Sequence, residues 1–131
     1  MTLNQYIDSE FALIVQDDGH IVNENMWSDE FLKFDYIGAP WPNSRKWKSR
    51  FYKKYNLKTA ETIAKNIDHN QVGNGGFSLR SKKLLELLAD MSSYNKIGEY
   101  HPEDVVICIK IKEELEKHGI NFAPISLAER F

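Results

Sequence analysis

The sequence predicts one α/β domain over residues 1–131, with a mixed, mostly parallel sheet flanked by helices. Short apolar runs alternate with helix-compatible segments along the chain, an order typical of α/β proteins. The 131 residues, of which 42% are hydrophobic, suffice for a single core, and the sequence shows no linker or internal repeat. In folds of this class the ligand site lies at the carboxyl ends of the strands.

The composition excludes several classes of protein. A single cysteine, Cys108, excludes an internal disulfide framework. No apolar run reaches the roughly 20 residues needed to span a bilayer, and the first residues lack the basic and apolar regions of a signal peptide. We therefore expect a reducing, cytoplasmic setting.

The first half of the chain is expected to hold two strands and a short helix. Residues 11–15 form an apolar run that ends abruptly in polar residues, as a buried strand does when it enters a loop. Ser28 is a suitable N-cap for a short helix within residues 27–34, whose first turn carries two acids. Residues 35–42 are typical of a short strand that ends in a loop bounded by prolines.

The second half is expected to hold two more strands and two helices. Three glycines within residues 72–76 interrupt regular structure, and residues 77–80 then alternate like a strand. Ser81 is positioned to cap the leucine-rich helix that follows. We predict a helix over residues 105–111, between Pro102 and Gly119, although its β-branched residues favour strands. Residues 120–125 are predicted to be the last strand.

A basic segment at residues 45–58 stands out from the rest of the chain. It holds seven lysines and arginines and no carboxylate, while the whole chain has a net charge of −2. Its aromatic residues, Trp47, Phe51 and Tyr55, are spaced by four and would share one face of a helix. Such a helix can contact an anionic membrane surface or clustered phosphates, or it can be a solvated insertion whose aromatic residues pack on the domain. The charge pattern favours a local anionic partner over general attraction to nucleic acid.

Two pairs of acidic residues are candidates for chemistry. Asp17 and Asp18 follow the first predicted strand, where carboxylates provide the hard oxygen ligands that suit Mg²⁺ or Mn²⁺. Glu103 and Asp104 begin a predicted helix, where a carboxylate in a cleft can serve as a general base. Each pair also has a simpler interpretation, because Asp-Asp-Gly is common turn chemistry and acids at a helix N-terminus complement the helix dipole.

The glycine cluster is a third candidate. The backbone around Gly73, Asn74, Gly75 and Gly76 can direct amides at a phosphate or let a sugar lie against it. The spacing matches neither the phosphate-binding P-loop nor the dinucleotide-binding pattern. A tight turn at the start of a strand is therefore an equal alternative.

The order of these motifs resembles a known family. The resemblance runs from Phe11 to Phe131 and is to a poorly characterised domain of unknown function that is usually regarded as glycosyltransferase-like. It is carried by the segments VQDDG (15–19), FDYIGAPWP (34–42), VGNGGFSLRS (72–81), PEDV (102–105), and FAP (122–124) with AERF (128–131). The wider similarity is to nucleotide-sugar transferases of the GT-A fold, so the resemblance implies a partial GT-A-like, Rossmann-related fold.

The resemblance implies a donor site at the acidic motif. In GT-A enzymes a strand-end acidic motif binds a divalent ion and the donor diphosphate. Gln16, Asp17 and Asp18 match it in place but not in its usual D-x-D spelling. The implied cofactor is Mn²⁺ or Mg²⁺, and the implied donor is a nucleotide-sugar, with a UDP-sugar favoured.

The resemblance also implies an acceptor site. The turn at Gly73, Gly75 and Gly76 and the acids that follow it are similar to the acceptor side of β-1,3-galactosyltransferase-like enzymes. By this analogy Asp104 or Glu103 would deprotonate a hydroxyl of a glycan or lipid-linked acceptor in an inverting displacement. Trp41 would stack on a sugar or belong to the core.

One departure from the GT-A pattern concerns the region before the acidic motif. GT-A enzymes build their nucleotide pocket from preceding strands and helices, and only sixteen residues precede Asp17. Either the chain is the C-terminal portion of a longer or split enzyme, or a partner chain or second copy supplies the rest, or the chain is a remnant without activity. A truncated sheet would expose an edge strand, which favours pairing with another chain.

The leading hypothesis from the sequence is a metal-dependent glycosyltransferase domain. The alternative, from another class, is a non-catalytic module whose basic helix at residues 45–58 contacts anionic lipid or nucleic acid and holds the protein at a membrane surface. Metal-dependent hydrolysis of phosphate esters at the same aspartates is a third, less favoured interpretation.

Overall fold

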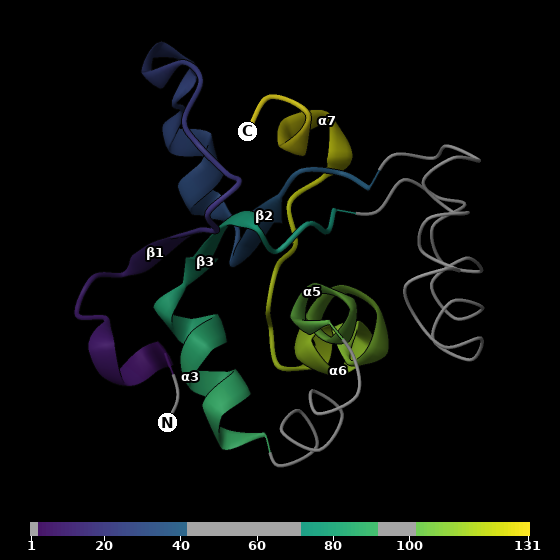
Figure 1. Ribbon diagram of the computed structural model, residues 1–131. Coiled ribbons are helices and arrows are strands. Elements are labelled where there is room, and N and C mark those ends of the chain that lie inside the picture. Colours follow the sequence, from purple (N-terminus) through teal and green to yellow (C-terminus); the bar gives the residue numbers. More distant parts are fainter. Residues whose placement is uncertain (1–2, 42–71, 92–101) are drawn as a thin grey trace.

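The computed structural model describes residues 3–41, 72–91 and 102–131, which form a mixed α/β fold (Figure 1). A small sheet lies between short helices, and the basic segment predicted at residues 45–58 lies outside the described residues. Among the helices of the described segments, none is long and apolar enough to cross a membrane.

The sheet has three strands in the order β1-β3-β2, and both pairs are antiparallel. The strands are β1 (Phe11–Val15), β2 (Tyr36–Gly38) and β3 (Phe77–Ser81). The sequence predicts all three, but its prediction of a mostly parallel sheet is wrong. The glycine segment starts β3 at the end of the sheet where β1 and β2 finish, so β3 runs in the opposite direction to both. A single parallel bridge in the described residues joins Tyr36 to Phe122.

One face of the sheet packs against the helices that follow residue 102. Tyr36 and Arg80 are cross-strand partners and lie on this face, because side chains alternate along a strand. The helices are α5 (Glu103–Val105) and η4 (Val106–Lys110), and Arg80 is ion-paired with Glu103 of α5. This face therefore carries charged and polar groups inside the fold.

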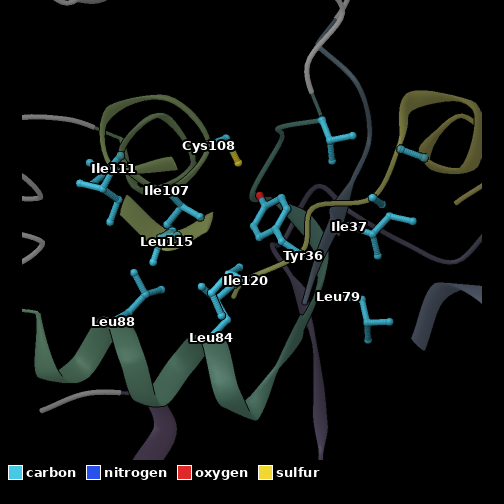
Figure 2. Close-up of a cluster of buried hydrophobic side chains, with 14 of the residues drawn as sticks. Tyr36, Ile37, Leu79, Leu84, Leu88, Ile107, Cys108, Ile111, Leu115 and Ile120 are labelled. Carbon is cyan, nitrogen blue, oxygen red and sulfur yellow. The ribbon is translucent and has the colours of Figure 1, made fainter. Parts of the chain in front are cut away.

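The opposite face packs against η3 (Asp29–Lys33) and the C-terminal residues. The contact is aromatic: Phe31 of η3 meets Phe131 edge to face at 5.2 Å between centroids, and Phe131 lies 5.3 Å from Phe77 of β3. Figure 2 shows Ile37 on the opposite side of β2 from Tyr36. The sheet is consequently covered on both faces.

Serine side chains cap two helices as the sequence predicts. Ser28 Oγ accepts a hydrogen bond from the Glu30 amide at the start of η3, which is a 3-10 helix. Ser81 Oγ accepts one from the Leu84 amide, at 3.1 Å, at the start of α3 (Lys82–Asp90). The buried residues of α3 are Leu84, Leu85 and Leu88. The 3-10 helices η1 (Leu3–Tyr6) and η2 (Glu24–Met26) flank β1 in the chain.

The segment predicted as a helix at residues 105–111 is helical, in consecutive parts. α5 continues into η4, a turn of π-helix, and α6 (Lys112–Lys117) follows. The wide π turn buries three consecutive residues, Val106, Ile107 and Cys108, which is broader than the single stripe of a regular amphipathic helix. Gly119 follows α6 with a positive φ of 77°, as expected of a helix stop.

Two details of the predicted strands are wrong. β1 is not buried: Leu13 and Val15 are 37% and 46% exposed, because β1 lies at an edge of the sheet. Residues 120–125 contribute the bridge at Phe122 but no strand. Pro124 has no amide hydrogen to donate to a ladder, and it precedes α7 (Ile125–Ala128) instead.

Tyr36 and Cys108 lie together in the core, with 0% and 1% of their surface exposed (Figure 2). Burial raises the pKa of the Cys108 thiol from 9.0 to about 12. Burial also raises the pKa of Tyr36 well above its ordinary value of 10.0. Both groups are therefore neutral in the folded protein, and Cys108 is the inert core residue that its apolar neighbours predict.

We expect the folded protein to lose stability at alkaline pH. The unfolded chain ionises Cys108 near pH 9.0, whereas the folded chain keeps the proton to about 12, so rising pH favours unfolding across this interval. The free energy of unfolding should fall by up to about 1.4 kcal/mol per pH unit for each such group. Urea unfolding between about pH 8 and pH 11 measures the slope. Cys108→Ala should make it shallower, and an unchanged slope would contradict the assignment.

Candidate functional site

Three of the sequence motifs meet at one end of the sheet, beyond the ends of its strands. β1 and β2 finish at this end, and β3, antiparallel to both, begins there. The acidic turn after β1, the Ala-Pro-Trp segment after β2 and the glycine segment before β3 are consequently neighbours (Figure 1). Two of the motifs therefore follow the carboxyl ends of β1 and β2, and the third precedes the amino end of β3.

The acidic motif forms a turn that is attached to the glycine segment. The Gly19 amide donates to the Gln16 carbonyl at 2.9 Å, so Asp17 and Asp18 are the two exposed central residues of the turn. The Gln16 amide donates to the Gly76 carbonyl at 2.8 Å. The Gln16 side chain also lies over Gly76, where a Cβ would come within 2.8 Å of Gln16 Oε1. The Gln16 side chain is exposed and can move aside for a Cβ, so the backbone hydrogen bond is the contact that holds the two motifs together.

The first glycine of the cluster is packed against Trp41. A Cβ on Gly73 would lie 2.3 Å from Trp41 Cε2, inside van der Waals contact. Trp41 is only 4% exposed, so of the two interpretations for this residue the structure places it in the core. The Gly73 carbonyl accepts a hydrogen bond from Tyr36 Oη at 3.2 Å, and a Cβ on Gly38 would lie 2.3 Å from the same carbonyl. These contacts fix one end of the glycine segment to β2.

Asn74 is the exposed residue of the glycine segment. Its φ of 45° is in the left-handed region, which asparagine tolerates better than most residues other than glycine. Because its neighbours Gly73 and Gly75 are buried, Asn74 is the side chain that the turn presents to solvent.

The last contact of the segment is with the acidic pair at the start of α5. The Gly75 amide donates to Asp104 Oδ2 at 3.3 Å, and a Cβ on Gly75 would lie 3.1 Å from Asp104 Cβ. The neighbouring Gly76 holds the acidic turn. Two consecutive glycines therefore separate the predicted metal ligands from the predicted base.

Glu103 and Asp104 differ in their partners. Both oxygens of Glu103 accept hydrogen bonds from Arg80, at 2.7 and 3.0 Å. Asp104 Oδ1 accepts from the Val105 amide at 2.8 Å, and Oδ2 accepts the longer bond from Gly75. Glu103 is thus bound to a permanent cation, whereas the half-buried Asp104 accepts hydrogen bonds from two backbone amides.

Arg80 is a residue of the site to which the sequence assigns no role. It is 1% exposed, and besides Glu103 its guanidinium donates to Ser78 Oγ at 3.1 Å and lies 5.6 Å from the centre of the Tyr36 ring. Burial alone would lower the pKa of Arg80, but the hydrogen bonds and charge of Glu103 raise it above its ordinary value. The one sequence feature that bears on Arg80 is the Ser-Leu-Arg alternation of β3, which places Arg80 on the polar face of the strand. That alternation suggests a solvated arginine, so it does not predict the burial that the structure shows.

The acidic turn is suited to a cation only together with a second ligand. Asp17 and Asp18 are exposed, and in the described residues no group of three or more His, Cys, Asp or Glu side chains is placed to hold a metal. Mg²⁺ and similar ions are commonly held by one or two carboxylates plus the phosphates of a substrate. Two adjacent aspartates beside a glycine turn fit that arrangement and no all-protein cage.

Comparison with known proteins gives one match. A family model described as a protein of unknown function (DUF5672) matches residues 3–131, which include all of the motifs described above. No curated protein and no solved structure matches the chain.

We expect the substitution Glu103→Gln to destabilise the fold by about 2–3 kcal/mol, because it leaves the buried Arg80 guanidinium without its counter-charge. Denaturant unfolding of the variant and the parent measures the difference. Glu113→Gln, at an exposed position of α6, is the matched control and should change the stability by less than about 0.5 kcal/mol. Equal stabilities for the two variants would show that the Arg80–Glu103 pair contributes nothing.

Proposed function

Because the chain belongs to the DUF5672 family, whose function is unknown, we propose a function from the site itself: a metal-dependent glycosyltransferase domain that transfers a sugar from a nucleotide-sugar to an acceptor hydroxyl. One observation carries the proposal. The antiparallel sheet and the adjacent Gly75 and Gly76 bring an exposed pair of aspartates and the half-buried Asp104 to the same end of the sheet. A transferase needs these two kinds of group close together, one for the leaving diphosphate and one for the attacking hydroxyl.

The donor side of the proposed site is the acidic turn. Asp17 and Asp18 would hold Mn²⁺ or Mg²⁺ jointly with the diphosphate of the donor, for which a UDP-sugar is the favoured class. The ion supplies positive charge that stabilises the departing diphosphate. The Gln16 amide donates to the Gly76 carbonyl, and this backbone bond fixes the turn relative to the glycine segment.

The acceptor side of the proposed site is Asp104. As general base it would take the proton of a glycan or lipid-linked hydroxyl while that oxygen bonds to the anomeric carbon and the bond to the diphosphate oxygen breaks, with inversion. Glu103 is unsuited to this role, because its two oxygens are engaged by Arg80. Of the two acids that the resemblance offers as the base, the geometry therefore favours Asp104, with Glu103 as a positioning residue.

The alternative of a non-catalytic module depends on the basic segment at residues 45–58, outside the described residues, so no contact in the structure favours it. Peripheral membrane attachment by that segment stays a prediction from the sequence.

We expect UDP to bind the protein more tightly when Mn²⁺ is present, and Mn²⁺ to bind more tightly when UDP is present. Two aspartates leave most of the coordination sphere to the diphosphate and water. Calorimetric titration with UDP, with and without Mn²⁺, measures the coupling. Asp18→Asn should weaken UDP binding in Mn²⁺ by at least about tenfold, whereas Asp8→Asn, an exposed acid before β1, should not. UDP binding that is indifferent to Mn²⁺ and to Asp18→Asn would contradict the donor site.

We expect Asp104→Asn to slow sugar transfer by about 10²–10⁴-fold without weakening the binding of UDP and Mn²⁺, because the base acts on the acceptor and not on the donor. The measurement is release of UDP from a panel of UDP-sugars in the presence of mixed glycan and lipid-linked acceptors. Glu103→Gln is compared at a temperature where it stays folded. A loss of donor binding in Asp104→Asn, or full activity, would show that Asp104 is not the base.

A further inference from the structure

The outer edge of β1 presents backbone groups that another strand can pair with. In the described part of the chain β1 pairs with β3 alone. The Gln16 amide donates to Gly76 at 2.8 Å, and the Glu10 carbonyl accepts from the Lys82 amide at 2.7 Å, so the even-numbered residues point their backbone groups at β3. In an antiparallel ladder the alternate residues point the other way. Leu13 and Val15 therefore direct their amides and carbonyls to the open edge.

The sequence of β1 lacks the usual protection of an edge strand. Natural edges carry charged residues, prolines or bulges that discourage pairing with another chain. β1 is Phe-Ala-Leu-Ile-Val, without a charge or a proline, and its five residues keep continuous register with β3. An edge of this kind is typical of a strand that has a pairing partner.

An apolar groove lies beside this edge. It has a volume of about 260 Å³, and its walls come from β1, the start of β3, η2 with its flanking residues, η3 and the C-terminus. The lining includes Leu13, Ile21, Met26, Trp27, Phe31 and Phe131. Leu13, Met26 and Trp27 are 37–55% exposed, so a strand added to β1 would place side chains on the same face as the groove and extend its apolar surface.

The charges around β1 determine which kind of strand fits. Asp8 and Glu10 precede β1, and Asp17 and Asp18 follow it; all four are exposed. A second copy paired antiparallel about Leu13 would set Asp8 of one chain directly opposite Asp18 of the other, with Glu10 on the diagonal from Asp18, which is repulsive. A foreign strand with basic residues beside its apolar centre meets opposite charge instead.

From these observations we propose that the edge of β1, with the groove beside it, binds an extended segment of a different polypeptide, apolar over about five residues and basic where it meets Asp8 and Glu10. The backbone of Leu13 and Val15 supplies the hydrogen bonds, the groove receives the alternate side chains, and the acids select the partner. The inference shares Asp17 and Asp18 with the proposed donor site, but its test can fail separately from sugar transfer, because it follows the amides of Leu13 and Val15 and the charges of Asp8 and Glu10 in the absence of metal.

The test uses the full chain and a synthetic peptide, Val-Thr-Val-Thr-Val with two lysines at each end, in metal-free buffer. Hydrogen exchange followed by NMR should show the amides of Leu13 and Val15 slowed at least about tenfold at saturating peptide, because these amides become bonded. The amides of Ala12 and Ile14, which already face β3, should change less. A peptide with glutamates in place of the lysines should bind at least about tenfold more weakly.

Variants locate the binding surface. Val15→Pro removes an outward amide that β3 does not use, and Leu13→Lys adds a charge to the edge. Both should abolish peptide binding, whereas Leu32→Lys, at a position of similar exposure in η3 (39% against 37%), should not. Reversing Asp8 and Glu10 to lysine should remove most of the preference for the lysine peptide over the glutamate peptide, because one end of either peptide then meets like charge; a general folding defect would instead abolish the binding of both peptides.

Two results would overturn the proposal. One is unchanged exchange at Leu13 and Val15 with millimolar lysine peptide. The other is protection of the same amides in the absence of peptide that grows with protein concentration and with a dimer in sedimentation, because the occupant would then be a second copy of this chain.

Discussion

The arrangement of the candidate site depends on a steric constraint, the close approach of three backbone segments at one end of a small sheet. Gly38 lies against the Gly73 carbonyl and Gly73 against the Trp41 ring, both at separations that leave no room for a Cβ, while the exposed Gln16 side chain lies over Gly76. The glycines are needed less for unusual dihedral angles than for the space that a side chain would occupy. A side chain at Gly38 or Gly73 would push the glycine segment away from β2 and Trp41.

The buried ion pair of Arg80 with Glu103 divides the work of the two neighbouring acids. Burying a guanidinium is costly unless its charge and its donors are satisfied, and here Glu103, Ser78 and the Tyr36 ring surround it. Glu103 is 48% exposed in its side chain, so the pair spans from the core to the surface. This pair anchors the start of α5, whereas the carboxylate of Asp104 accepts hydrogen bonds from backbone amides.

The sequence predicts those features whose causes are local. The caps at Ser28 and Ser81, the stop at Gly119 and the strands of the sheet follow from short-range patterns, and the structure confirms them. Strand direction is different, because it depends on the end of the sheet at which the glycine segment starts β3. The alternation of strands and helices along the sequence does not reveal that end. The role of Arg80 is equally difficult to predict, since its partner Glu103 lies in another part of the chain. The alternation of β3 suggests that Arg80 is exposed to water, but helices cover that face of the sheet and bury it. The order of the motifs nonetheless placed the acidic turn, the glycines and the second acidic pair in one candidate site, and the structure brings them together.

The central position of β3 has a consequence for the time at which the fold can form. β1 and β2 have no ladder with each other in the described residues, and each is joined to the sheet through β3, which begins only at Phe77. During synthesis the apolar β1 segment must therefore wait for a long stretch of chain before its partner exists, and contacts so distant in sequence form slowly. The nascent chain is thus exposed to mispairing until Ser81 has left the ribosome, because neither ladder of the sheet can be complete before then.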